Sequence, residues 1–292
     1  MVKPNQSVMR FGNRFMSNAY GMRSAPLGKE KAADELRVMV FGDSIVNGGD
    51  SVDQADLATT QLQASLNQAS NQNVVNQNIV NQNVKSQNAV VGNISSNSWG
   101  PGNWLAYAQE YGFFEADTVV LVISSHDYAD VPTFEPLEES SFPTQQPISA
   151  LSEALIRYAP KAFSKITGLG GTASDHLMEI TEQNIASAMG DLQQFLQLAK
   201  GQSDNVLVFQ HWDQFETETN EADPGYQLIQ ALCEELGITH HSLGPSFRQA
   251  IAQGTHPYRD SIHPNELGQK LIGEAILEVL LANDTAAIEE SP

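Results

Sequence analysis

The chain has few basic side chains and almost no cysteine. It carries 15 Lys and Arg residues against 35 Asp and Glu residues among 292, for a formal net charge of −20 at pH 7. Nucleic acids and anionic membranes bind basic surfaces, so this balance argues against both as partners. The single cysteine, Cys233, can form no internal disulfide, and its Ala-Leu-Cys-Glu-Glu-Leu context favours a small core residue in a helix.

Long apolar runs are also missing. No stretch approaches the roughly 18–20 apolar residues of a membrane span, and the N-terminal residues lack the apolar core of a signal peptide. A cytoplasmic protein is the default expectation, with an exported or periplasmic protein as the alternative. Hydrophobic residues nevertheless make up 41% of the chain, which is enough to build a core and excludes global disorder. The sequence does not indicate an oligomeric state.

The charges are unevenly distributed along the chain. Residues 1–31 contain six Lys or Arg side chains and a single acid, Glu30, whereas the remainder is strongly acidic. We therefore expect a basic N-terminal arm over 1–35, either solvated and mobile or lying on the acidic body. A transit-like segment or an electrostatic anchor is the alternative. Residues 284–292 are expected to form an acidic tail.

Short apolar runs alternate with segments of helical periodicity. The runs predict five strands, at about 37–42, 88–94, 118–124, 205–211 and 238–242. The helical patterns lie at about 53–69, 102–112, 176–200, 225–236 and 265–282. This alternation is typical of an α/β fold, with a five-stranded, mostly parallel sheet covered by helices on both faces. Functional residues of such a sheet gather at the carboxyl ends of its strands.

Two stretches depart from that alternation, and both are predicted to be insertions within a domain spanning 36–283. An Asn-rich tract repeats every five residues over 68–86, and we interpret it as an expanded connecting loop, with a small β-solenoid as the alternative. Residues 128–175 are rich in Pro, Ser and Thr and follow the third strand directly. They are expected to form a lid over the site, although a disordered surface excursion is equally compatible with 137–147.

Two short strings carry the parts of a nucleophilic serine site. Val-Met-Val-Phe-Gly-Asp-Ser ends at Ser44, directly after the first strand, and Asp-Ser-Ile-His-Pro places Asp260 three residues before His263. A hydroxyl, a base and an orienting carboxylate are what acyl transfer requires. The Ser44 N–H, at a strand-to-helix junction, can also receive an oxyanion. Taken separately, Gly-Asp-Ser is common turn chemistry, and Asp-x-x-His can be a metal-ligand pair or a helix cap.

These two strings resemble the first and last blocks of the GDSL-type, or SGNH, hydrolases. The resemblance covers about residues 36–283 and implies a three-layer, flavodoxin-like α/β/α fold with Ser44, Asp260 and His263 as the catalytic residues. It also implies an oxyanion glycine in the second block, for which Gly100 is the first choice and Asn97, Ser98 or Gly102 are alternatives. In the third block, normally Gly-x-Asn-Asp, His126 stands where the oxyanion-binding Asn is expected.

Weaker candidates surround these positions. Trp99, Asn103, Asp127 and His211 are candidates for contact with substrate, with a satisfied histidine at the strand edge as the simpler interpretation of His211. The spacing of His240, His241 and His256 gives no zinc pattern. No metal or organic cofactor is expected. The resulting hypothesis is a serine esterase acting on a short O-acyl ester, most simply acetyl, of a small substrate or a glycan. A glycan O-acetyltransferase using the same acyl-serine and a catalytically degenerate glycan-binding protein remain as alternatives.

Overall fold

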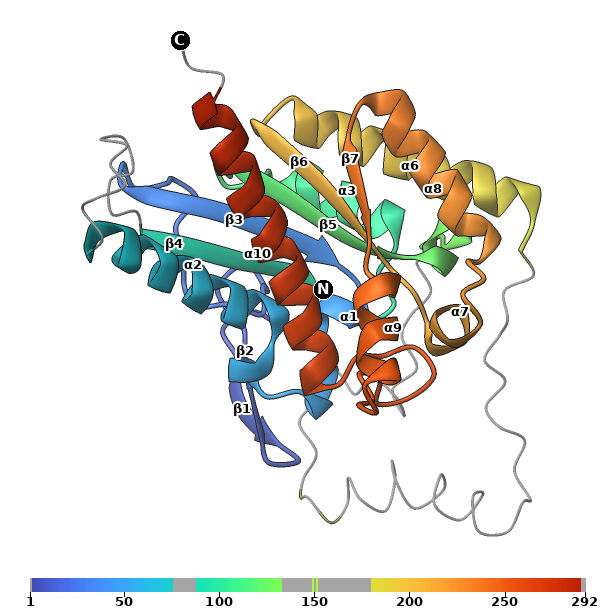
Figure 1. The fold of residues 1–292 in the computed structure, drawn as a ribbon, viewed down its shortest axis with the longest axis horizontal. Coiled ribbons are helices and arrows are strands. Elements are labelled where there is room, and N and C mark those ends of the chain that lie inside the picture. Colours follow the sequence, from blue (N-terminus) through green and yellow to red (C-terminus); the bar gives the residue numbers. More distant parts are fainter. Residues whose placement is uncertain (1, 76–87, 133–148, 150, 152–179, 290–292) are drawn as a thin grey trace. The chain divides into compact units, whose positions relative to one another are not determined.

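A five-stranded parallel sheet forms the centre of the fold. The computed structural model describes residues 2–75, 88–132, 149, 151 and 180–289 (Figure 1). The strands run in the order β4-β3-β5-β6-β7, and every neighbouring pair is parallel. Their bounds are β3 Glu35–Gly42, β4 Asn88–Ser95, β5 Thr118–Ser124, β6 Asn205–His211 and β7 Thr239–Ser242. The predicted α/β fold and its five strands are confirmed.

Helices cover both faces of this sheet (Figure 1). Side chains alternate between faces along a strand, so β3 directs Met39 and Phe41 to one core and Val38 and Val40 to the other. The first core is closed by α3 (Pro101–Tyr111), α6 (Glu182–Lys200) and α8 (Pro224–Leu236). The second is closed by α2 (Ala58–Val75), α9 (Gly244–Ala252) and α10 (Glu266–Glu289). None of the helices in the described ranges is long and apolar enough to cross a membrane.

Helix α2 continues into the Asn-rich tract, so the prediction that a loop begins at residue 68 is wrong. Polar side chains of α2 form hydrogen bonds with the backbone of β4, at the outer edge of the sheet. Asn67 Oδ1 accepts the N–H of Ala89 at 2.8 Å, and Gln63 Oε1 accepts that of Val91 at 2.9 Å. Strand β4 is an edge strand, so these contacts satisfy donors that no other strand pairs. The rest of the tract, 76–86, lies outside the described residues.

The N-terminal residues pack on the domain instead of forming a solvated arm. They include a hairpin of β1 (Ser7–Arg10) and β2 (Asn13–Met16), which the sequence analysis did not predict. Met22 is fully buried in the core, and Arg23 is 1% exposed. The Arg23 guanidinium donates hydrogen bonds to the carbonyl oxygens of Asn47, Gly49 and Val52. Residues 2–34 are therefore part of the same compact unit as the sheet.

Two further boundaries differ from the sequence prediction. The proposed lid was expected to begin at residue 128, but Tyr128 and Ala129 are buried and close the short 3₁₀ helix η3 (Ser125–Ala129). The proposed acidic tail was expected from 284, but α10 runs to Glu289. The remainder of the predicted lid lies almost entirely outside the described residues.

Candidate active site

Ser44 stands at the carboxyl end of β3 as the first residue of the short helix α1 (Ser44–Asn47). The Asp43 side chain caps this helix by accepting the N–H of Ile45 at 2.7 Å. Gly42 makes the turn possible, because a Cβ there would lie 2.3 Å from Val46 Cγ2 and 3.1 Å from the Val122 carbonyl oxygen. The first N–H groups of a helix have no partner within it, so α1 presents the Ser44 N–H beside the Ser44 hydroxyl.

His263 and Asp260 complete a hydrogen-bonded chain to that hydroxyl. His263 Nε2 lies 3.0 Å from Ser44 Oγ, and His263 Nδ1 lies 2.9 Å from both carboxylate oxygens of Asp260. This is the connectivity of a serine–histidine–aspartate triad. The structure therefore brings together the three side chains that the sequence predicted, from positions more than two hundred residues apart.

The Asp260 carboxylate is held in its charged form. Burial by itself raises the pKa of this carboxyl group. Hydrogen bonds from the N–H groups of His263, at 2.8 Å, and Ile262, at 3.1 Å, together with the charge of His263, outweigh burial and lower the pKa to about 2. The side chain thus accepts from the tight turn that carries it while it orients the imidazole.

A hydrogen bond from His211 supports the turn that carries Asp260 and His263. Of the two interpretations of the sequence, a substrate contact and a satisfied histidine at the strand edge, the second is confirmed: His211 is 1% exposed, and its Nε2 donates to the Ile262 carbonyl at 2.9 Å. Burial lowers the pKa of His211 to about 4, which keeps the ring neutral. The N–H of Gln214 donates to the Ser261 carbonyl at 2.9 Å and holds the same turn against α7 (Gln214–Thr219). These contacts fix where His263 stands.

Gln269 is a positioning residue that the sequence analysis missed. Its Nε2 donates to the Ile45 carbonyl of α1 at 2.6 Å, and its Oε1 accepts the N–H of Ala58 at 3.0 Å. The side chain is fully buried and connects α10 to the helix that carries Ser44. The sequence did contain a signal for this role. Gln269 precedes the buried Ile272 by three positions and Ile276 by seven, and helical residues with this spacing lie on one face.

Gly100 does not offer a free oxyanion donor, contrary to the prediction. Its N–H already donates to Asn103 Oδ1 at 3.1 Å, where it begins α3. The same bond occupies the Asn103 side chain, which was expected to contact substrate. Of the alternatives, Asn97 and Ser98 lie exposed in the turn after β4, and Ser98 has a positive φ of 57°. That conformation favours glycine, which is what the resemblance expects in this block.

The aromatic candidate beside this turn is part of the core. Trp99 is 8% exposed and packs against Tyr107, with 5.7 Å between ring centroids. Trp104 is fully buried and donates its indole N–H to the Gly42 carbonyl at 2.9 Å. Trp99 is therefore not placed to stack on a sugar, and Trp104 supports the turn that carries Ser44.

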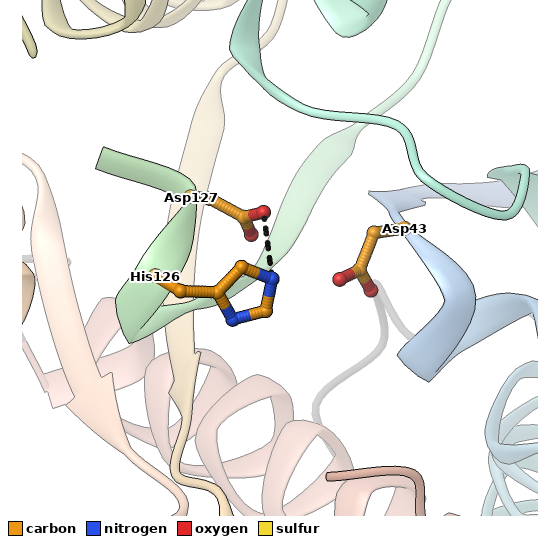
Figure 2. Close-up of side chains that lie close together, drawn as sticks. All are labelled: Asp43, His126 and Asp127. Carbon is orange, nitrogen blue, oxygen red and sulfur yellow. Dashed lines mark ion pairs between the residues drawn. The ribbon is translucent and has the colours of Figure 1, made fainter. Parts of the chain in front are cut away.

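His126 and Asp127 lie beside Asp43 at the ends of β5 and β3 (Figure 2). The His126 side chain is 48% exposed, and its Nε2 lies 3.6 Å from Asp127 Oδ1. Asp127, another predicted substrate contact, is completely buried and accepts the N–H of Ser124 at 2.8 Å. Burial raises the pKa of Asp127 well above its usual range, and burial together with the Asp127 charge raises the pKa of Asp43.

Comparisons with known proteins identify the fold. No family model and no curated protein sequence matches the chain. Among solved structures it is similar to a two-domain esterase active on acetylated mannans, at 13% identity over 89% of this chain and 52% of that one, with a TM-score of 0.52. It is also similar to an alpha/beta hydrolase enzyme from the metagenome of Lake Arreo, Spain, at 14% identity over 86% and 97%, with a TM-score of 0.50.

A member of the lipolytic protein G-D-S-L family from Veillonella parvula is similar at 14% identity over 84% of this chain and 97% of that one, with a TM-score of 0.49. At these identities the likeness is one of fold. The chain shares its α/β fold with these structures, and it carries a hydrogen-bonded Ser44–His263–Asp260 arrangement at the carboxyl edge of its sheet.

Proposed function

We propose that the protein is a serine esterase that hydrolyses a short O-acyl ester, acetyl in the first place, through an acyl-serine intermediate. The observation that carries this proposal is the 3.0 Å contact of Ser44 Oγ with His263 Nε2, with Asp260 on the other ring nitrogen. A serine hydroxyl is a weak nucleophile unless a base takes its proton, and this contact supplies the base.

The steps follow from that contact. Ser44 Oγ attacks the ester carbonyl carbon while His263 Nε2 takes the hydroxyl proton. The tetrahedral intermediate collapses, the C–O bond to the alcohol breaks, and His263 returns the proton to the leaving oxygen. Water then attacks the acyl-serine by the same route and releases the acid. The Ser44 N–H, with further donors from the exposed turn at Asn97–Ser98 and from His126, receives the oxyanion.

A carbohydrate ester is the proposed substrate class. The support is the fold shared with an esterase that acts on acetylated mannans, together with the polar, exposed turn beside the nucleophile. Because Trp99 is buried, its ring cannot stack on a sugar. Recognition of a sugar is therefore assigned to polar groups of the turn.

The first experiment measures p-nitrophenol release from acetyl, butyryl and octanoyl esters. We expect wild type to prefer acetyl and Ser44→Ala to lose at least about 10⁴-fold in kcat, as is typical when a triad serine is removed. Ser51→Ala, which removes an exposed hydroxyl seven residues away, should retain wild-type rates. Equal rates for wild type and Ser44→Ala would refute the acyl-serine mechanism and favour a glycan-binding role.

Acetylated oligosaccharides test the proposal that the substrate is a carbohydrate ester. Release of acetate from acetylated manno- and xylo-oligosaccharides by wild type, and not by Ser44→Ala, is the expected result. A preference for octanoyl esters with no acetate release from either sugar would contradict the substrate class while leaving the mechanism intact.

A further inference from the structure

Asp43, His126 and Asp127, three side chains that the proposed esterase chemistry does not require as a set, lie close together (Figure 2). Asp43 comes from the end of β3, and His126 and Asp127 come from η3 at the end of β5. One ligand-type atom from each lies within 4.8 Å of those of the other two. Asp43 is 3% exposed and Asp127 is fully buried, whereas the His126 ring opens to solvent.

Asp127 directs an unsatisfied oxygen into this cluster. Its Oδ2 accepts the N–H of Ser124, but its Oδ1 is buried and has no hydrogen-bond partner among the described residues. That oxygen faces His126 Nε2 at 3.6 Å, which is longer than a hydrogen bond. A buried carboxylate oxygen left unpaired is costly unless something else binds it.

Asp43 leaves a second oxygen weakly bound at the same place. Its Oδ1 is used to cap α1, whereas its Oδ2 is approached by the Ser124 hydroxyl at 3.4 Å. Two carboxylates in a dry environment repel each other unless a proton or a cation lies between them. In its unprotonated form the His126 ring carries a lone pair on one nitrogen, and this lone pair can bind a metal ion.

We infer that Asp43, His126 and Asp127 form a binding site for a divalent transition-metal ion of the Zn²⁺ type. One imidazole nitrogen with two carboxylate oxygens is a ligand set that zinc accepts, and the nitrogen disfavours Mg²⁺ and Ca²⁺, which prefer oxygen. Three protein ligands leave coordination positions open toward the exposed side, where the His126 ring meets solvent. The sequence-based prediction of no metal did not include Asp43, His126 or Asp127 among the candidate ligands.

A second cluster of acidic side chains differs from this one, because hydrogen bonds satisfy its carboxylate oxygens. Asp213, Glu216 and Asp223 also lie within 4.8 Å of one another. There, however, Asp213 Oδ1 accepts the Glu216 N–H at 2.8 Å, and the two Glu216 oxygens accept the N–H groups of Asp213 and Asp223, each at 2.9 Å. Asp213 and Glu216 thus form the capping box of α7, so the oxygens of these two carboxylates are used without a metal.

The inferred site is compatible with the proposed oxyanion role of His126. Coordination through Nε2, the nitrogen that faces Asp127, would leave the proton on Nδ1, so the ring would keep one defined donor. The inference itself does not rest on the proposed esterase activity, because it is tested by metal content and affinity.

The test is equilibrium dialysis of the full-length protein, stripped with EDTA, against ZnCl₂ at pH 7.5, with bound metal measured by mass spectrometry. We expect one Zn²⁺ per wild-type chain at this site. His126→Ala, which removes an exposed ligand, should weaken binding by more than about tenfold. Asp127→Asn should do the same, because the amide can still accept the Ser124 N–H but offers an NH₂ group where the ion would bind.

His256→Ala is the matched control, since this histidine is exposed and outside the cluster. It should bind Zn²⁺ as wild type does. Absence of stoichiometric binding in wild type would overturn the inference and indicate a proton shared by the two carboxyl groups. Equal binding by wild type, His126→Ala and Asp127→Asn would show that zinc binds elsewhere. Anomalous diffraction from a zinc-soaked crystal, with the peak among the three side chains, is the positive structural result.

Discussion

In the proposed mechanism, the contact of Asp260 with His263 orients the base and keeps it in the correct tautomer. The Asp260 side chain is 46% exposed, yet it accepts two backbone N–H groups as well as the ring N–H. With its pKa lowered to about 2, it remains a carboxylate throughout the neutral range. The carboxylate is therefore available both to hold the ring tautomer and to stabilise the imidazolium formed during attack.

We predict that Asp260→Asn lowers kcat by at least about 100-fold while the thermal unfolding midpoint changes little, because loss of the orienting carboxylate leaves the wrong ring tautomer. Steady-state hydrolysis of p-nitrophenyl acetate and a circular dichroism melt measure the two quantities. Glu266→Gln, which neutralises an exposed carboxylate three residues beyond His263, serves as the control. An unchanged kcat in Asp260→Asn would exclude Asp260 from the proposed mechanism.

The positions of individual site residues could be predicted where a short local sequence motif determines them. Ser44, Asp260 and His263 were placed by the end of a strand and by a tight turn, and the structure brings them together. Gly100 was misassigned because its N–H is used by Asn103, three positions later, at the start of α3. Residues that act through distant contacts, such as Gln269, depend on tertiary packing that no single string reveals.

The turn between β3 and α1 has no room for a side chain. A Cβ at Gly42 would lie 2.3 Å from Val46 Cγ2, a distance that real Cβ atoms do not adopt, and a tight 3.1 Å from the Val122 carbonyl oxygen. We predict that Gly42→Ala displaces α1, lowers the free energy of unfolding by about 1–3 kcal/mol and reduces kcat by about 100-fold, because the nucleophile moves away from its base. Urea denaturation and steady-state kinetics provide the measurements.

Gly190→Ala is the matched control for that substitution. Gly190 lies within α6, and a Cβ there would meet no atom within 4 Å. Alanine is the better helix former, so this variant should gain about 0.5–1 kcal/mol of stability and keep its kcat. Were Gly42→Ala as stable and active as Gly190→Ala, the close packing of α1 on the sheet would be wrong.

Strands β3 and β5 were predictable because both of their faces are buried, which produces continuous apolar runs. The β1–β2 hairpin has no such run, since Val8 is 41% exposed and Met9 is 64% exposed. The four-residue helix α1 is too short for helical periodicity to appear. Helix α2 extends to Val75, beyond its apolar pattern, and its contacts with β4 are made by the polar side chains of Gln63 and Asn67.

At the scale of the whole molecule, buried neutral histidines make stability depend on pH. Burial, with a smaller effect from the neighbouring His241, lowers the pKa of His240 to about 4. The ring is held neutral, with Nε2 hydrogen-bonded to Gln210 Oε1 at 2.8 Å. The unfolded chain takes up a proton on this histidine below pH ~6.5, so the folded state loses stability as the pH falls from there to about 4.

We predict that His240→Gln, which keeps a donor for Gln210 but does not titrate, gains stability relative to wild type as the pH falls from 7 to 4. The comparison is made with a variant because burial raises the pKa of carboxyl groups such as Glu216, whose titration acts in the opposite direction. Urea unfolding at several pH values measures the difference. A difference that does not change with pH would show that His240 titrates normally in the folded protein.

The contacts of Arg23 change where this domain should be considered to begin. The recognisable pattern starts near residue 36, and a fragment cut there would retain every residue of the proposed triad. Such a fragment would also remove the donor that binds the carbonyl oxygens of Asn47, Gly49 and Val52, just beyond the nucleophile. We therefore expect a fragment that begins at residue 36 to lose its activity although it keeps all three side chains of the proposed triad, because the segment around Asn47–Val52 would lose the guanidinium that holds it.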